Sequence, residues 1–313
     1  MSELIQGTEK IKKVTSLQRR KRQKSFFIFT MLLIPVAYWL FHWIYINGST
    51  IIMAFQDQFG VFTTNNFLKV KELLFVEQNS AIKTSLLNSV KTFFFTELIG
   101  VPVSLVISFF ISKQIFGYKQ FRVIFYLPHI ISSIVLITAF KQIVSPLGPI
   151  VPICKDLGIN LPSQGLLHSP STATSTIIFY SIWTTACGNI LFYSAMSRIP
   201  PELIEVGKLE GLQLFKELIY VILPLIWPTF STTLILDLTG ILNAGGPVLL
   251  FGTDVLYNGK TTTLPYWFFS QVQNSKIGTH GLMSAVGLSF TTISVPFTLF
   301  IRWLLNKADK AEY

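Results

Sequence analysis

Residues 198–224 read RIPPELIEVGKLEGLQLFKELIYVILP, and this stretch determines how the whole chain is interpreted. Pro200 or Pro201 suits the first turn of a helix, because the N–H that proline lacks would have no intrahelical acceptor there. Glu202 and Glu205 then lie near the positive end of the helix dipole, where a negative charge is stabilising. The stretch therefore predicts a short helix that begins at the two prolines.

This short helix has one apolar face and a glycine beyond its end. Leu203, Val206 and Leu209 recur every three residues and therefore lie on one side of the helix. Gly211 is the residue type that commonly follows the end of a helix, because it permits a sharp turn. We expect the helix to lie across the mouth of a helix bundle and to offer its apolar face to a groove on a partner.

The composition is that of a membrane protein. Half of the 313 residues are hydrophobic, and the mean hydropathy is +0.55. Only 13% of the residues are Asp, Glu, Lys or Arg, which is about half the share in an average soluble domain. A soluble domain of this size would need more charge to cover its surface, so the composition argues against one.

Six segments are apolar enough and long enough to cross a bilayer, which takes about 20 helical residues. The first follows a basic run, as in a signal peptide, but it is longer than a signal segment and contains two tryptophans, so we expect an uncleaved transmembrane helix. Pro224 and Pro228 should kink the fifth segment. The six segments are residues 26–46, 86–111, 123–144, 173–196, 218–242 and 282–305.

The basic residues in the loops indicate the orientation of these segments. One side of the membrane carries 17 of the 25 Lys and Arg residues and the other side carries six, which places both termini in the cytoplasm. The net charge of +10 is therefore mainly a topology signal. The predicted organisation is a basic cytoplasmic segment (1–25), a first transmembrane helix (26–46), an extracellular loop (47–85), a core of five transmembrane helices (86–306) with a cytoplasmic loop at 197–217, and a cytoplasmic tail (307–313).

The sequence carries no signature of an enzyme or of a metal site. Residues 259–261 read Gly-Lys-Thr, as at the end of a P-loop, but the first glycine of a P-loop would fall at Asp254. The four histidines are dispersed and fit no metal-ligand spacing. Cys154 and Cys187 form no disulfide framework, and we expect both to be unbridged. We predict no catalytic residue, metal or cofactor in this chain.

The spacing within residues 198–224 resembles the EAA motif of binding-protein-dependent ABC importer permeases, E-A-A-x3-G-x9-I-x-L-P. This chain keeps Glu205, Gly211 and Leu223-Pro224 at the motif spacing. Its departures from the motif are Val206-Gly207 for Ala-Ala, Val221 for Ile, and Glu210 where relatives often have Asp.

Other stretches resemble the sugar-importer branch of that family, of the type of the first permease subunit for maltose and oligosaccharides. The resemblance covers roughly residues 85–305. It rests on Asn88, the run from Phe121 to Pro128, Ile182-Trp183, Gly188-Asn189, Ile199-Pro200, Gly245-Gly246-Pro247 and the run from Gly281 to Ala285.

The resemblance implies an all-α type I importer permease fold with six transmembrane helices and a cytoplasmic coupling helix. It implies a bacterial cytoplasmic-membrane subunit that moves an oligosaccharide by alternating access. The expected partners are a homologous second permease, an extracellular solute-binding protein and two cytoplasmic ATPase subunits that bind ATP and Mg. The residues expected to contact an ATPase are Leu203, Glu205, Val206, Gly207, Glu210 and Gly211.

An oligosaccharide needs flat aromatic faces and hydrogen-bonding partners along its path. In the family, the fourth and fifth segments usually carry such residues. Asp237 stands out, because a carboxylate within a membrane is costly and usually faces a cavity or a partner. It could equally form a structural hydrogen bond to the second permease, and Trp183 could equally serve packing. The candidate substrate residues are Trp183, Thr184, Asn189, Tyr193, Thr233, Asp237 and Asn243.

Two other functions stay open at this point. One is a permease of the same architecture for another solute, such as a peptide, phosphate or a polyamine. The other is an ion-driven secondary transporter, which would need buried ion-binding carboxylates and internal symmetry. Glu97 and Asp237 are the only acidic residues deep in the predicted segments. Lys91 and Glu97 are six residues apart and do not pair along a helix, so each could pair with another helix.

Overall fold

The computed structural model describes residues 2–77, 80–159, 162, 164–188, 190–243, 251, 261–274 and 280–310. Within these ranges the regular structure is helical, and the extended pairing amounts to an isolated bridge between Gln56 and Phe62. The predicted all-α fold is therefore confirmed.

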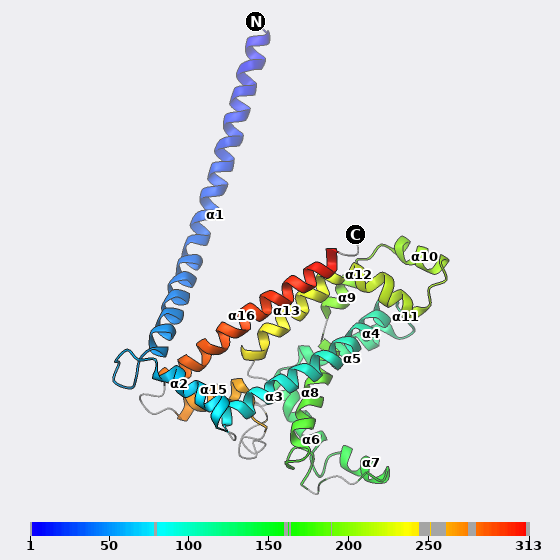
Figure 1. The fold of residues 1–313 in the computed structure, drawn as a ribbon. Helices are drawn as coiled ribbons and strands as arrows, with labels where there is room; N and C mark the ends of the chain where they lie inside the picture. The colour runs from blue at the N-terminus through cyan, green and yellow to red at the C-terminus, as the bar shows by residue number, and fades with distance from the viewer. Residues whose placement is uncertain are drawn as a thin grey trace.

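Figure 1 shows how the helices follow one another along the chain. The N-terminal half contains α1 (Ser2–Ala54), α2 (Asn65–Lys71), α3 (Ala81–Phe95), α4 (Val101–Ser112), α5 (Tyr118–Ile130), α6 (Ser133–Ile143) and α7 (Ile150–Asp156). The C-terminal half contains α8 (Ala173–Gly188), α9 (Ile190–Met196), α10 (Pro201–Leu209), α11 (Leu214–Glu217), α12 (Leu223–Leu225), α13 (Trp227–Asn243), α15 (Leu264–Asn274) and α16 (His280–Lys310). Three π-helical turns extend helices: η1 (Glu72–Val76) continues α2, η2 (Thr96–Gly100) joins α3 to α4, and η3 (Leu218–Ile222) joins α11 to α12.

Four helical stretches are long and apolar enough to cross a membrane, and two bent helix pairs bring the number to six if each pair is one span. All six predicted segments therefore fall on helices. The four continuous stretches are Arg20–Ala54, Ala81–Ser112, Ala173–Met196 and His280–Ala308, and the bent pairs are Tyr118–Ile130 with Ser133–Ile143 and Leu214–Leu225 with Trp227–Ile241.

The third and fifth predicted segments are not straight. Helices α5 and α6 meet at 106°, because Ile131 and Ser132 have extended backbone between them. The third predicted segment is therefore bent at Ile131 and Ser132. In the fifth segment the axis turns by 78° between α12 and α13, at Ile226, which lies between Pro224 and Pro228. The kink predicted from these two prolines is confirmed.

Helix α1 is longer than the predicted first segment. It extends on both sides of residues 26–46, and α2 and η1 occupy part of the predicted 47–85 loop. From residue 20 to residue 47 its side chains are exposed, as expected for a helix surrounded by lipid. Its C-terminal part packs against α16, while its N-terminal part projects beyond the other helices (Figure 1).

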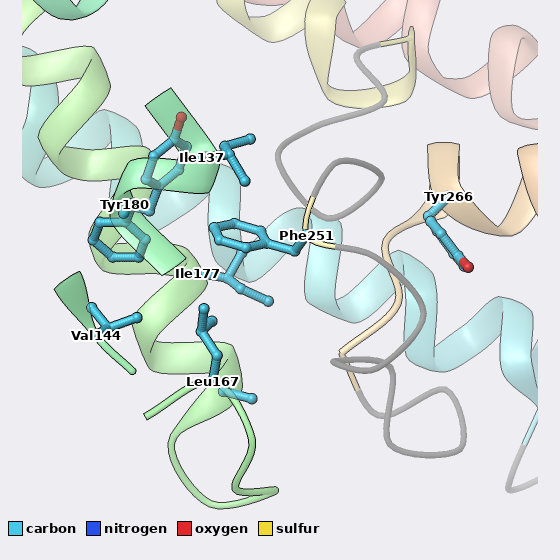
Figure 2. Packing of buried hydrophobic residues seen from close by; sticks show 9 residues of the cluster. Ile137, Val144, Leu167, Ile177, Tyr180, Phe251 and Tyr266 are labelled. Atoms are coloured by element: carbon cyan, nitrogen blue, oxygen red, sulfur yellow. The ribbon is translucent and has the colours of Figure 1, made fainter. Parts of the chain in front are cut away.

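Buried apolar residues form three clusters that hold the helices together. The cluster between α6, α8 and Phe251 packs aromatic rings among aliphatic side chains, and we call it the aromatic cluster. The ring of Phe251 lies 5.4 Å from that of Tyr180 and 6.1 Å from that of Phe140, and points between α6 and α8 (Figure 2). A second cluster joins α1, α2, α3, α15 and α16. The third joins α4, α9 and η3 and contains Val101, Leu105, Phe109, Phe192, Met196, Leu218, Ile222 and Ile226.

Candidate functional site

Helix α10 begins and ends where the sequence predicts. Its first residue is Pro201, and Glu202 lies in its first turn. The apolar side chains of Leu203, Val206 and Leu209 are all exposed, with Leu209 at 87% exposure. The described residues therefore leave the apolar face of α10 uncovered at the end of the molecule where α11 and α12 also lie (Figure 1).

The turn after α10 depends on glycine. Gly211 has φ +77°, which is a left-handed conformation, and Leu212 N–H donates to Gly207 O at 3.1 Å. This is the Schellman arrangement that ends many helices. Gly207 is buried, and a Cβ there would lie 3.3 Å from Leu212 Cδ1 and 3.5 Å from Val221 Cγ2. Gly207 thus lies on the inward side of α10, whereas Glu205 and Glu210 are exposed.

A buried ion pair links the end of α11 to the end of the second membrane segment. Lys113, just after α4, binds the carboxylate of Glu217 at the end of α11. The Glu217 side chain is 4% exposed and that of Lys113 is 20% exposed. The Lys113 ammonium also lies 5.4 Å from the centre of the Phe109 ring. The sequence analysis did not find this pair, although both residues flank predicted membrane segments.

A cleft of about 260 Å³ lies between four parts of the chain. They are α3 together with η2, then α8, then α13, and the start of α15. It brings together the two carboxylates that the sequence places deep in the membrane, Glu97 on η2 and Asp237 on α13. Its lining is Ser89, Thr92, Phe93, Thr96, Glu97, Ile177, Ser181, Leu236, Asp237, Gly240, Ile241, Thr263 and Pro265.

The π-helical turn η2 positions Glu97. Pro102 follows directly in the first turn of α4 and has no N–H to continue an α-helical ladder, and π turns inside helices are frequent at functional sites. Gly100 is buried against α8, where a Cβ would lie 3.1 Å from Thr185 Cβ. Small residues of this kind let membrane helices approach closely, and here they hold η2 against α8 beside the cleft.

The segment before α15 forms one wall of the cleft and is attached to α3 by three hydrogen bonds. Ser85 Oγ donates to Thr262 Oγ1 at 2.8 Å, and Asn88 Nδ2 donates to Thr262 O at 2.9 Å. Leu264 N–H donates to Ser89 Oγ at 2.8 Å. Thr263 lies between these anchored neighbours and lines the cleft.

Of the predicted substrate residues whose side chains the structure describes, Asp237 lines the cleft. Thr233 is buried one turn away and donates to Thr229 O at 3.0 Å. Trp183 stacks on Phe140 with ring centres 6.3 Å apart, at the edge of the aromatic cluster.

The remaining predicted substrate residues are dispersed. Thr184 donates to Tyr180 O and Ser181 O along its own helix. Tyr193 accepts a hydrogen bond of 3.3 Å from Arg122 and lies under its guanidinium. Asn189 and the side chain of Asn243 lie outside the described residues, as do residues 245–247.

Glu97 and the cleft hydroxyls were not among the predicted site residues. The signal for Glu97 was present, because a carboxylate in an apolar segment is itself unusual, but its convergence with Asp237 depends on packing. Among the described residues, no group of three or more His, Cys, Asp or Glu side chains could hold a metal ion. Cys187 is buried and Cys154 is half-buried, and both are free thiols, as predicted.

Comparison with known proteins identifies relatives over most of the chain. A probable ABC transporter permease protein of Mycoplasma genitalium is 26% identical, over 80% of this chain and 75% of that one. A probable starch degradation products transport system permease of Thermoanaerobacterium thermosulfurigenes is 26% identical, over 76% of this chain and 86% of that one. The match to an arabinooligosaccharides transport system permease of Bacillus subtilis is 22% identical and spans about half of each chain, 52% in both cases.

Solved structures share the fold. A chain of a bacterial ABC transporter that imports the acidic polysaccharide alginate superposes with a TM-score of 0.76 and 19% identity, over 91% of this chain and 96% of that chain. The resemblance noted from the EAA-like spacing is confirmed by a match over residues 98–310. The chain therefore belongs to the family of binding-protein-dependent transport system inner membrane components.

Proposed function

We propose that this chain is the membrane-spanning subunit of an ATP-driven importer that moves an oligosaccharide across the bacterial cytoplasmic membrane by alternating access. Family membership supports the permease role, and the names of several relatives refer to oligosaccharide or starch-product transport. The cleft adds a physical argument, because its hydroxyl and carboxylate groups match the hydrogen-bonding needs of a sugar.

The observation that carries the proposal is the uncovered apolar face of α10. Three apolar side chains on a nine-residue helix would be costly to leave in water. A groove on a cytoplasmic ATPase subunit would cover them, with Glu205, Glu210 and the Gly211 turn at the rim. Movement of α10 would reach the membrane segments through α11 and the Lys113–Glu217 pair.

The proposal also includes the other subunits of the importer and the side of the membrane on which each loop lies. ATP and Mg would bind to two ATPase subunits, a second homologous permease would complete the pathway, and an extracellular binding protein would deliver the sugar. The two ends of the described chain and α10 lie toward the same end of the molecule (Figure 1). This supports a cytoplasmic location for residues 1–25, the 197–217 loop and the 307–313 tail, with 47–85 outside.

The substrate pathway would include Asp237 and Thr233 on α13 together with Trp183 and Thr184 on α8. Tyr193, Asn189 and Asn243 stay candidates on the same two segments. Family membership argues against the ion-driven alternative, and a permease for another solute is the alternative that the experiment must address.

The test is uptake by the reconstituted complex in liposomes, with the second permease, the ATPase subunits and the binding protein. ATP inside the liposomes should drive accumulation of a labelled oligosaccharide that the binding protein binds, and ionophores should leave uptake unchanged. Uptake that ionophores abolish, or ATP-driven uptake of peptides or polyamines without any sugar, would overturn the proposal.

A further inference from the structure

The cleft between η2, α8 and α13 has an unusual balance of charge. Glu97 and Asp237 are 140 positions apart in the sequence, and the fold brings both to one small space within the membrane segments. The rest of the described lining consists of hydroxyl-bearing, apolar and small residues, with no Lys, Arg or His. Neither carboxylate takes part in a described ion pair; the one recorded lies at Lys113, at the end of α4.

Three polar atoms of the cleft are buried without a hydrogen-bond partner. They are Thr96 Oγ1, Glu97 Oε2 and Thr263 Oγ1. Thr263 is 7% exposed, and its neighbours Thr262 and Leu264 are held to α3 by hydrogen bonds, so its backbone position is fixed. Buried polar groups in folded proteins nearly always have partners. Three unpaired ones around a single cleft therefore point to a ligand that supplies the missing partners.

The chemistry of the lining defines which ligand fits. Carboxylate oxygens accept hydrogen bonds from hydroxyl, amide and ammonium groups, and threonine hydroxyls can donate or accept. A ligand carboxylate would instead find no cation among the described lining residues, and any negative charge on Glu97 or Asp237 would repel it strongly in a site of low dielectric constant. Specificity of this kind comes from rejection of the wrong ligand as much as from attraction of the right one.

We infer that this cleft is a charge-selective sugar site, which accepts neutral sugars and amino sugars and rejects uronates through Glu97 and Asp237. The inference rests on the proposed function and names its substrate class. An importer of the acidic polysaccharide alginate shares this fold. We do not expect this chain to accept an acidic sugar, because the groups that select the sugar here are themselves acidic.

The test measures equilibrium binding to the purified transporter complex without its binding protein, so that the specificity of the binding protein does not contribute. The probes are maltotetraose, a glucosamine tetramer and tetragalacturonate, which share length and differ in charge. The wild-type complex should bind the first two, and tetragalacturonate at least about tenfold more weakly, which corresponds to ~1.4 kcal/mol. Equal binding of tetragalacturonate would overturn the inference.

Variants separate the role of the charges from that of the shape. Glu97→Gln with Asp237→Asn keeps the size of both side chains and should raise tetragalacturonate binding about tenfold while weakening that of the glucosamine tetramer. Asp156→Asn, an exposed carboxylate on α7, is the matched control and should change nothing. Thr263→Val removes one unpaired hydroxyl at nearly constant shape and should weaken maltotetraose binding without lowering the yield of assembled complex.

The outcomes distinguish this inference from the proposed function. ATP-driven uptake of maltotetraose with unchanged charge selectivity in the double variant refutes the inference alone. Failure of the complex to bind or transport any sugar refutes both. If the double variant does not assemble, the Thr263→Val variant tests the site instead. Unchanged maltotetraose binding in that variant would refute the inference.

Discussion

Replacing Lys113 by Met should destabilise the protein strongly, because it leaves the carboxylate of Glu217 buried without a cation. The Glu217 side chain is 4% exposed, and Lys113 is the basic residue that contacts it. Removing one partner of a buried ion pair typically costs about 3–5 kcal/mol. Because Lys113 is 20% exposed, water can partly reach the site, and we expect a loss near the lower end, ~3 kcal/mol.

The compensating variant distinguishes loss of the pair from loss of packing. Lys113→Met combined with Glu217→Leu removes both charges, and replacing a buried ion pair by apolar residues is often neutral. The double variant should therefore recover most of the stability. Lys119→Met, at an exposed lysine in the first turn of α5, is the control and should stay within about 0.5 kcal/mol of wild type.

The assay is reversible unfolding of the purified permease in mixed micelles, followed by helical circular dichroism. The free energy of unfolding should fall for Lys113→Met, and most of that loss should be recovered in the double variant. A loss below about 1 kcal/mol for Lys113→Met would refute the reasoning, since it would mean that Glu217 is solvated. In the assembled importer, the stable double variant should also transport less sugar per ATP hydrolysed, because the link between α11 and α4 is gone.

Two further substitutions test the backbone of the site. Gly211→Val should cost about 1–2 kcal/mol and weaken association with the ATPase subunits in a pull-down, because a β-branched residue resists φ +77°; an association equal to wild type would contradict the role of the turn. Gly100→Leu should destabilise the permease by about 1–3 kcal/mol in the micelle assay, because its side chain would meet Thr185. Gly48→Leu, where nothing lies within 4 Å of the added Cβ, is the control, and equal losses for the two would show that α8 does not contact η2 closely.

Local sequence signals predicted the features that depend on one or two residues. The proline pair at 200–201 and Gly211 give the limits of α10, because proline and glycine restrict or release the backbone directly. The turn at Ile226 follows from the prolines on either side of it for the same reason. These features depend on backbone geometry and need no knowledge of tertiary packing.

Other features could not be predicted because their causes are not local. Ile131 and Ser132 break the third segment, although neither is a glycine or a proline. The basic residues that precede residue 26 are good helix formers, so α1 extends through them although they do not belong to the apolar segment. Charge and hydropathy locate a span and do not define where its helix ends.

The convergence of Glu97 and Asp237 is also a tertiary property. Each carboxylate was visible as an exception within an apolar segment, but nothing in either segment identifies the other as its neighbour. The close approach at Gly100 and the hydrogen bonds around Thr262 bring the walls of the cleft together. Lys91, which the sequence offered as another possible partner for a distant helix, is exposed in the described structure.

Cysteine crosslinking of α10 in the intact importer tests the central claim most directly. Leu209→Cys would be placed on α10 and Leu147→Cys between α6 and α7, where Leu147 is 99% exposed. Helices α6 and α7 lie at the opposite end of the molecule from α10 (Figure 1). Each cysteine is introduced in a background with the two native cysteines replaced. The account predicts that the cysteine at position 209 crosslinks to an ATPase subunit and reacts with impermeant reagents only from the cytoplasmic side. Labelling of position 209 from outside the cell, or a crosslink to the ATPase from position 147 instead, would contradict it.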